Sequence, residues 1–182
     1  MRYDFTQPQL AWRDEVRAFI RDHLKPPLLD ELRESGNEGQ GPLAREFVLK
    51  LRDRGWWGLP WPKEYGGLGR SAIEQWMFVD ELEGAGAPML PLTVTSVAPT
   101  IMRVGSEEQK QHWLPRIKAA EVEFALGYSE PEAGTDLAAL RTRAVLDGDY
   151  WVINGQKMWN TMAHMATHNW LAIRTEPDAP KH

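Results

Sequence analysis

The period of the apolar residues changes near residue 122, and this change constrains the fold more than any other feature of the chain. Before it, apolar residues recur every three or four positions, which is the spacing of one helical face. The clearest such stripe is formed by Trp12, Val16, Phe19 and Ile20. After it, short apolar runs of strand length are separated by turn residues. The sequence therefore predicts an all-helical domain over residues 1–122 and a β domain over residues 123–182.

Five helices are expected in the first domain from its capping residues and prolines. They begin near Pro8, Pro42, Ser71, Thr93 and Ser106. Each of the two serines opens a capping box, because Glu or Gln follows three residues later. Pro26-Pro27 is expected to end the first helix, and Pro115 to interrupt or restart the fifth. The third helix, through Leu82, carries apolar residues on more than one face, which indicates packing between neighbours.

Residues 55–69 form a segment that no regular element accommodates, because five glycines and two prolines fall within it. Gly55 suits the left-handed position after the second helix. The segment also carries the large apolar side chains Trp56, Trp57, Trp61 and Tyr65. A packed, ordered loop is therefore expected. Its Gly66-Gly-Leu-Gly69 run lacks the third glycine and the preceding strand of a dinucleotide-binding turn, so it is interpreted as an ordinary turn.

Five strands are expected in the second domain, following one another as an antiparallel meander. They are Phe124–Ser129, Arg141–Leu146, Tyr150–Ile153, Lys157–Trp159 and Asn169–Thr175. Asp147-Gly148 and Asn154-Gly155 are typical hairpin turns. The sequence ends shortly after the last strand, so the sheet is expected to be incomplete and to keep an open edge.

Composition excludes several function classes. The chain has 26 acidic and 21 basic residues, a net charge of −5, and no clustered basic patch of the kind that binds nucleic acid. It has no cysteine, which excludes disulfides, thiolate metal sites and a cysteine nucleophile. His164 and His168 have the spacing of two ligands on a helix, but no acidic partner accompanies them, so no metal site is expected.

No membrane or export segment is expected from the sequence. The first residues contain no apolar run of the secretory type. The longest uncharged stretch, Gly84–Met102, contains three prolines. It is therefore interpreted as a buried segment and not as a membrane span. The expected location is the cytoplasm.

Two motifs in the β domain carry the functional prediction. The first is Tyr128-Ser-Glu-Pro-Glu-Ala-Gly-Thr-Asp136, and the second is Asn154-Gly-Gln-Lys-Met-Trp-Asn-Thr161. Taken alone, the first is better explained as an ordinary strand-to-turn connection, and the second as a core tryptophan, Trp159, followed by a strand-end threonine, Thr161. Together, and in this order, they resemble the flavin-binding signature of the acyl-CoA dehydrogenase family. Trp61-Pro-Lys-Glu-Tyr-Gly-Gly67 and the region from Gly105 to Ile117 are similar to further parts of that family.

The resemblance implies an α+β fold and a flavin enzyme. The fold is an N-terminal all-α domain followed by an incomplete antiparallel β-barrel-like domain, with the family's C-terminal helical bundle absent. The implied reaction is FAD-dependent α,β-dehydrogenation of an acyl-CoA thioester, in which hydride passes to flavin N5. The implied partners are the acyl-CoA substrate, electron-transfer flavoprotein or a similar acceptor, and further subunits of a homo- or hetero-oligomer.

The resemblance also assigns site residues. The cofactor-binding set is Leu126, Tyr128, Ser129, Gly134, Thr135, Trp159 and Thr161. Ser129 is implied to bind the pyrimidine part of the flavin, Trp159 to cover its face, and Thr161 to donate toward its N5/O4 edge. Thr135 is implied to lie between the flavin pyrophosphate and acyl-CoA, and so to be a substrate contact as well. Asn160 departs from the family, and strand alternation would point it away from the flavin.

No catalytic residue is assigned, because the family's catalytic glutamate lies in the bundle that this chain lacks. Glu130 and Glu132 belong to the cofactor loop and are poor substitutes. The chain alone is therefore expected to be inactive. Two alternatives stay open: a non-catalytic partner subunit of a heteromeric complex, and a flavin monooxygenase or nitroalkane-oxidase-like member. Small side chains over Leu90–Met102, and a similarity to actinobacterial members of the steroid-degrading type, favour a bulky acyl group.

Overall fold

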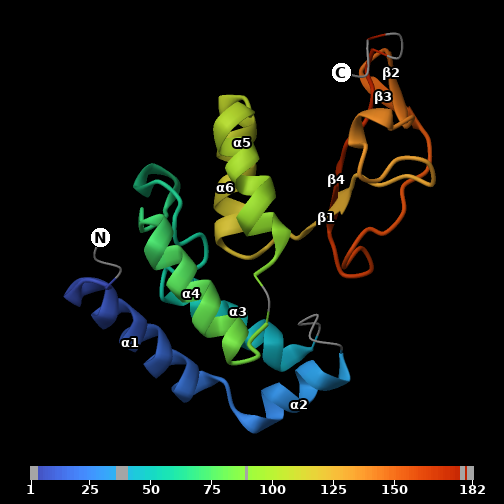
Figure 1. Ribbon diagram of the computed structural model, residues 1–182. Coiled ribbons are helices and arrows are strands. Elements are labelled where there is room, and N and C mark those ends of the chain that lie inside the picture. Colours follow the sequence, from blue (N-terminus) through green and yellow to red (C-terminus); the bar gives the residue numbers. More distant parts are fainter. Residues whose placement is uncertain (1–3, 36–40, 89, 177–178, 180–182) are drawn as a thin grey trace. The chain divides into compact units, whose positions relative to one another are not determined.

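The computed structural model describes residues 4–35, 41–88, 90–176 and 179 of the chain. The chain divides into two compact units, residues 1–121 and 122–182, and each is described by itself. The first unit contains the α-helices, and the second contains the strands and a short 3-10 helix, η3 (Leu137–Ala139) (Figure 1).

Six α-helices occur in the described part of the first unit. They are α1 (Gln7–His23), α2 (Pro26–Glu34), α3 (Pro42–Asp53), α4 (Ala72–Gly84), α5 (Ala98–Val104) and α6 (Glu107–Lys118). A short 3-10 helix, η1 (Lys63–Tyr65), lies between α3 and α4, and a π-helix, η2 (Thr93–Val97), leads directly into α5. The predicted fourth helix is thus helical throughout, but its first turn is π-helical.

Helix α2 was not expected from the sequence. Pro26-Pro27 does follow the end of α1, but the pair also occupies the first two positions of α2, where proline is favoured because its fixed φ is helical and no N–H is needed. Glu31 of α2 then accepts hydrogen bonds from the backbone N–H groups of Leu43 (3.1 Å) and Ala44 (2.7 Å). The carboxylate therefore caps α3, whose own N-cap residue Gly41 has no side chain.

The predicted capping boxes are confirmed. Ser71 accepts from the backbone of Glu74 while the Glu74 carboxylate accepts from the backbone of Ser71, and Ser106 and Gln109 do the same at α6. Helix α6 continues through Pro115, so this proline neither interrupts nor restarts it.

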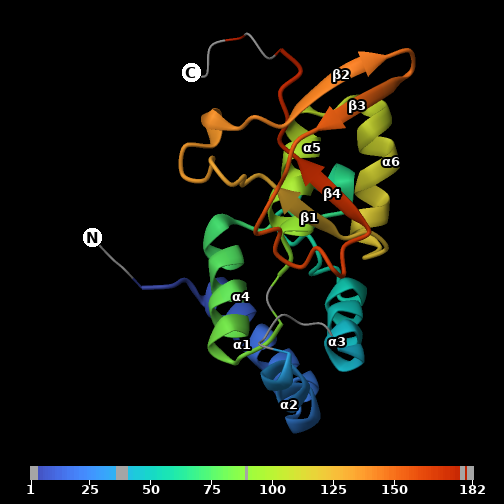
Figure 2. The ribbon, with the colours of Figure 1, turned by 90° about the vertical axis from the view of Figure 1, so that its right-hand side faces the viewer.

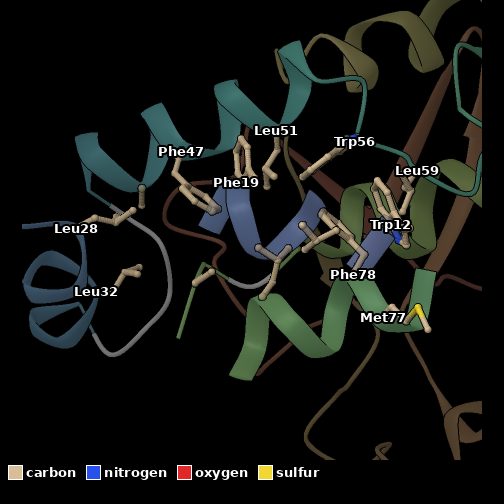
Figure 3. Packing of buried hydrophobic residues seen from close by; sticks show 14 residues of the cluster. Trp12, Phe19, Leu28, Leu32, Phe47, Leu51, Trp56, Leu59, Met77 and Phe78 are labelled. Carbon is tan, nitrogen blue, oxygen red and sulfur yellow. The ribbon is translucent and has the colours of Figure 1, made fainter. Parts of the chain in front are cut away.

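The core of the first unit is built from aromatic and aliphatic side chains of α1, α2, α3 and α4 and the loop after α3 (Figure 3). Trp12 and Trp56 meet edge to face with ring centroids 5.0 Å apart. Buried indoles donate their N–H groups to backbone carbonyls: Trp57 to Ile117 (3.0 Å) and Trp61 to Val94 (3.1 Å). The segment 55–69 is thus the packed loop that the sequence predicts.

Helix α4 is not enclosed on all sides. Met77, Phe78 and Leu82 are buried, whereas Ile73 and Trp76 are about half exposed. The prediction that this helix is packed between neighbours on more than one face is therefore wrong for its first turns in this unit.

Four strands occur in the described part of the second unit (Figure 2). They are β1 (Phe124–Gly127), β2 (Arg143–Asp147), β3 (Tyr150–Asn154) and β4 (His168–Leu171). Strands β2 and β3 form the predicted antiparallel hairpin, in which Asp147 pairs with Tyr150 across a two-residue loop. Strands β1 and β4 pair in parallel, with Phe124 opposite His168. The simple antiparallel meander is therefore wrong for the first and last strands, and the small sheets form no closed barrel.

Residues 155–160 contain no regular secondary structure, so the predicted strand Lys157–Trp159 and the second hairpin turn are wrong. The last predicted strand is shorter than expected, ending at Leu171, although Arg174 still forms a bridge to β2. These corrections matter because the second motif lies in this irregular segment. Because this segment forms no strand, contacts other than the backbone hydrogen bonds of a sheet must hold it in place.

Candidate functional site

The two motifs of the β unit are joined by a backbone hydrogen bond. The Met158 N–H donates to the Ser129 carbonyl oxygen at 3.0 Å. This bond links the residue just before Trp159 with one of the predicted flavin contacts. The first motif and the irregular segment of the second therefore lie side by side.

A buried ion pair joins the same two motifs. Lys157 Nζ lies 2.8 Å from Glu130 Oε1, and the two side chains are only 8% and 6% exposed. Lys157 Nζ also donates to the Tyr128 carbonyl oxygen at 3.0 Å. The lysine thus contacts the first motif at two points, one neutral and one charged.

The Glu130 carboxylate is surrounded by donors. Its Oε2 accepts from the Arg141 N–H at 2.6 Å, and its Oε1 from the Thr142 N–H at 2.9 Å. Burial raises the pKa of Glu130, but the hydrogen bonds from Lys157, Thr142 and Arg141 outweigh it and lower the pKa from 4.5 to about 2. The carboxylate is therefore ionised at neutral pH and has its lone pairs engaged.

The loop after Glu130 is closed on itself. The Glu130 N–H donates to the Ala133 carbonyl at 2.7 Å, and the Ala133 N–H donates back at 3.2 Å. Gly134 and Thr135 follow on the exposed side of this turn, and open space surrounds the position of a Cβ at Gly134. An incoming polar group can reach this part of the backbone.

Strand β1 carries the remaining predicted contacts of the first motif. Leu126 lies opposite Trp170 of β4 and is half-buried, as are Tyr128 and Ser129 just beyond the strand. Between them, a Cβ at Gly127 would lie 2.4 Å from Leu171 Cδ2 and 2.7 Å from Asn169 Oδ1. A larger residue at this position would therefore require the Leu171 and Asn169 side chains to move.

Trp159 and Thr161 lie on the surface of the β unit. Trp159 is 80% exposed and has φ +60°, a left-handed conformation that is unusual for a tryptophan. An indole this large is seldom left so exposed without a partner. The argument from strand alternation for Asn160 does not apply, since no strand forms here. The Asn160 amide nitrogen instead lies 3.4 Å from the position of a Cβ at Gly127, toward β1.

Neither acidic residue of the loop suits a catalytic base. The low pKa of Glu130 makes its carboxylate a weak proton acceptor, and Glu132 forms an ion pair with Arg141. Glu130 and Lys157 themselves were missed as functional partners. The available signal was that Lys157 is the single charged residue of the second motif, while Glu130 is one of three acidic residues in the first.

The two histidines do not share a helix. His164 lies in a turn, and His168 begins β4, where its Nδ1 lies 2.8 Å from Thr167 Oγ1 and its ring packs against Phe124. Among the residues that the structure describes, no cluster of three metal-binding side chains occurs.

Comparison with known proteins explains why the motifs lie in this order. The family model "Acyl-CoA dehydrogenase, N-terminal domain" matches residues 6–121, and "Acyl-CoA dehydrogenase, middle domain" matches residues 125–182. The chain belongs to the acyl-CoA dehydrogenase family. The resemblance predicted from the motifs is thereby confirmed, as is the combination of a helical domain with part of the middle β domain.

Several members of the acyl-CoA dehydrogenase family are similar to nearly the whole chain. Acyl-CoA dehydrogenase FadE26 of Mycobacterium tuberculosis is 49% identical over 180 residues, which are 98% of this chain and 45% of that protein. The ChsE4–ChsE5 complex from Mycobacterium tuberculosis matches with a TM-score of 0.86 and 50% identity, over 97% of this chain and 45% of that one. The Tcur3481–Tcur3483 steroid ACAD matches with a TM-score of 0.89 and 47% identity, over 100% and 47%.

One further family structure bears on the cofactor. A glutaryl-CoA dehydrogenase from Mycobacterium smegmatis, solved in complex with FADH2, matches with a TM-score of 0.79 and 29% identity, over 94% of this chain and 44% of that one. The present chain spans about half the length of the relatives it matches. Among the helices that the structure describes, none is both long and apolar enough to cross a membrane.

Proposed function

We propose that this chain supplies the helical domain and the flavin-binding face of an FAD-dependent acyl-CoA dehydrogenase. One observation carries the proposal: the two motifs that would hold the cofactor are tied together at Ser129–Met158 and end on the exposed indole of Trp159. Residues 1–122 and 123–182 then act as the family's N-terminal domain and part of its middle domain.

The described residues fit FAD in shape and in donor type. The exposed, flat indole of Trp159 suits one face of an isoalloxazine ring. Ser129, Thr135 and Thr161 offer hydroxyl groups for the ring edge and the pyrophosphate, Leu126 and Tyr128 offer apolar contact beside β1, and Gly134 leaves room for the approach. Thr135 would also contact acyl-CoA. When bound, FAD supplies the hydride acceptor, and the protein supplies binding and orientation.

The catalytic base would come from outside this chain. A weakly acidic proton beside a thioester needs a carboxylate with a raised pKa, whereas the pKa of Glu130 is lowered and Glu132 is paired with Arg141. We therefore expect the 182-residue chain to bind FAD without dehydrogenating an acyl-CoA. Turnover of an acyl-CoA with an artificial electron acceptor would contradict this.

We infer that the acyl group is bulky and steroid-derived. Residues 90–102 combine small side chains with the π-helix η2, a local widening of the helix that is common at functional sites. The likeness to the Tcur3481–Tcur3483 steroid ACAD supports the same substrate class. Electron-transfer flavoprotein or a similar protein would accept the electrons.

A second candidate is a non-catalytic subunit of a two-subunit dehydrogenase. The similarity to the ChsE4–ChsE5 complex favours a heteromer. The two candidates differ in flavin content. A catalytic subunit needs FAD stacked on the exposed indole of Trp159, whereas a non-catalytic subunit does not have to bind FAD.

Equilibrium titration of the 182-residue chain with FAD tests the proposal. We expect saturable quenching of flavin fluorescence. Trp159→Ala should weaken binding about two- to tenfold, because an aromatic stacking contact contributes about 0.5–1.5 kcal/mol. The matched control is Trp151→Ala, which removes another indole of the β unit that is 53% exposed. Equal effects of the two substitutions, or no binding by the unaltered chain, would refute the proposal.

A further inference from the structure

We propose that Lys157 is a positioning residue that holds the two flavin motifs in register through Glu130. The inference rests on the proposed function, since it explains how this chain keeps Trp159 and Thr161 beside Ser129. Lys157 contacts neither the ring nor the substrate in this proposal. It acts through the backbone that carries those residues.

The need for such a residue follows from the irregular segment 155–160. A strand would be held by a ladder of backbone bonds, but no strand forms here. Met158 makes one backbone bond to Ser129, and the next backbone bond in the segment, from Ala163 to Asn160, is local. A single bond between two segments leaves them free to pivot about it.

Lys157 removes that freedom because it adds two contacts next to the Met158 bond. Its ammonium group reaches the Tyr128 carbonyl at 3.0 Å and Glu130 Oε1 at 2.8 Å. Together with the Met158 bond, three successive residues of the first motif are tied to two successive residues of the second. The side chain is only 8% exposed, so water does not compete effectively for these bonds.

Glu130 also connects the two motifs to the segment that precedes β2. Its carboxylate also accepts the N–H groups of Arg141 and Thr142, the residues that lead into β2. The lysine charge is balanced by the carboxylate at 2.8 Å, so the pair supplies a fixed geometry and adds no net charge to the site. A side chain without donors at position 157, such as methionine, leaves both the carboxylate and the Tyr128 carbonyl without this partner.

The test compares Lys157→Met with Lys110→Met in the 182-residue chain. Methionine keeps most of the aliphatic stem and removes the ammonium group. Lys110 is a matched control because it pairs with Glu107 at 2.8 Å, has a side chain only 16% exposed, and lies in the helical unit. Two quantities are measured: the hydrogen exchange rate of the Met158 amide, and the affinity for FAD.

We expect Lys157→Met to speed exchange at Met158 at least tenfold and to weaken FAD binding roughly tenfold, while Lys110→Met changes neither. The β2–β3 amides should stay protected, which shows that the unit still folds. If they do not, Lys157→Gln, which removes the charge but keeps amide N–H donors on a shorter side chain, is judged by the same two measurements. In Lys157→Ala, added n-propylammonium should restore FAD affinity, and sodium at equal ionic strength should not.

Two results would overturn the inference. One is unchanged exchange at Met158 in the substituted chain. The other is faster exchange at Met158 with unaltered FAD affinity, since the bond would then be dispensable for the site. Failure of the unaltered chain to bind FAD is a different result: it refutes the proposed function, and the exchange rate of Met158 alone then decides whether Lys157 holds the motifs together.

Discussion

Replacement of Glu130 by Gln should cost the β unit about 3 kcal/mol of stability at neutral pH, and less in acid. The pKa of Glu130 is lowered from 4.5 to about 2 by hydrogen bonds from Lys157, Thr142 and Arg141 that outweigh its burial. At about 1.4 kcal/mol for each pKa unit, that difference corresponds to about 3 kcal/mol. A unit of this size is expected to have only about 3–9 kcal/mol in total.

The pH dependence has a definite sign. Above pH 4.5 the carboxylate is ionised in both folded and unfolded chains, so the whole contribution is present. As the pH falls below 4.5, the unfolded chain takes up a proton that the folded chain does not, and stability is lost until about pH 2. The difference between the native chain and Glu130→Gln should therefore be about 3 kcal/mol at pH 7 and about 1 kcal/mol at pH 3.

Urea unfolding followed by NMR measures this difference within the β unit. The indole N–H signals of Trp151, Trp159 and Trp170 report on residues 122–182, whereas the other six tryptophans report on the helical unit. The substitution should lower the urea midpoint of the three signals and leave the six unchanged. A difference between the two chains that stays constant from pH 7 to pH 3 would refute the assigned ionisation of Glu130.

Three further predictions concern the helical unit. Gly67→Ala should destabilise it strongly, because the new Cβ would lie 2.0 Å from the Trp61 carbonyl oxygen, whereas Gly84→Ala meets open space and should leave the melting temperature unchanged or raise it. Trp61→Phe removes the buried bond to the Val94 carbonyl and should cost about 1–3 kcal/mol in urea unfolding; an unchanged midpoint would contradict this. Ser71→Ala removes half of a capping box and should cost about 1 kcal/mol, seen as a lower melting temperature; an unchanged melting temperature would contradict this.

Local features of the fold could be predicted from the sequence because their determinants are close together along the chain. Ser71 and Ser106 cap their helices through partners three residues away, and the β2–β3 hairpin forms around its turn. Helix α2 could have been predicted too, because proline favours the first positions of a helix as much as it ends one.

Non-local features could not be predicted in the same way. The parallel pairing of β1 with β4 joins residues 44 positions apart, and no local pattern specifies it. The irregular segment at Lys157–Trp159 has a strand-like composition, but its neighbours bind it through a buried ion pair and one backbone bond. The pair itself joins residues 27 positions apart, so its role appears only when both motifs are folded.

The central claim is that the β unit holds FAD between the two motifs, and amide chemical-shift mapping tests it most directly. Addition of FAD to the 15N-labelled chain should shift the amide signals of Ser129, Gly134, Thr135 and Thr161 and the indole signal of Trp159. The tip of the β2–β3 hairpin and helix α1 should not respond. Shifts confined to the helical unit or to the hairpin tip, or no shifts at all, would contradict the account.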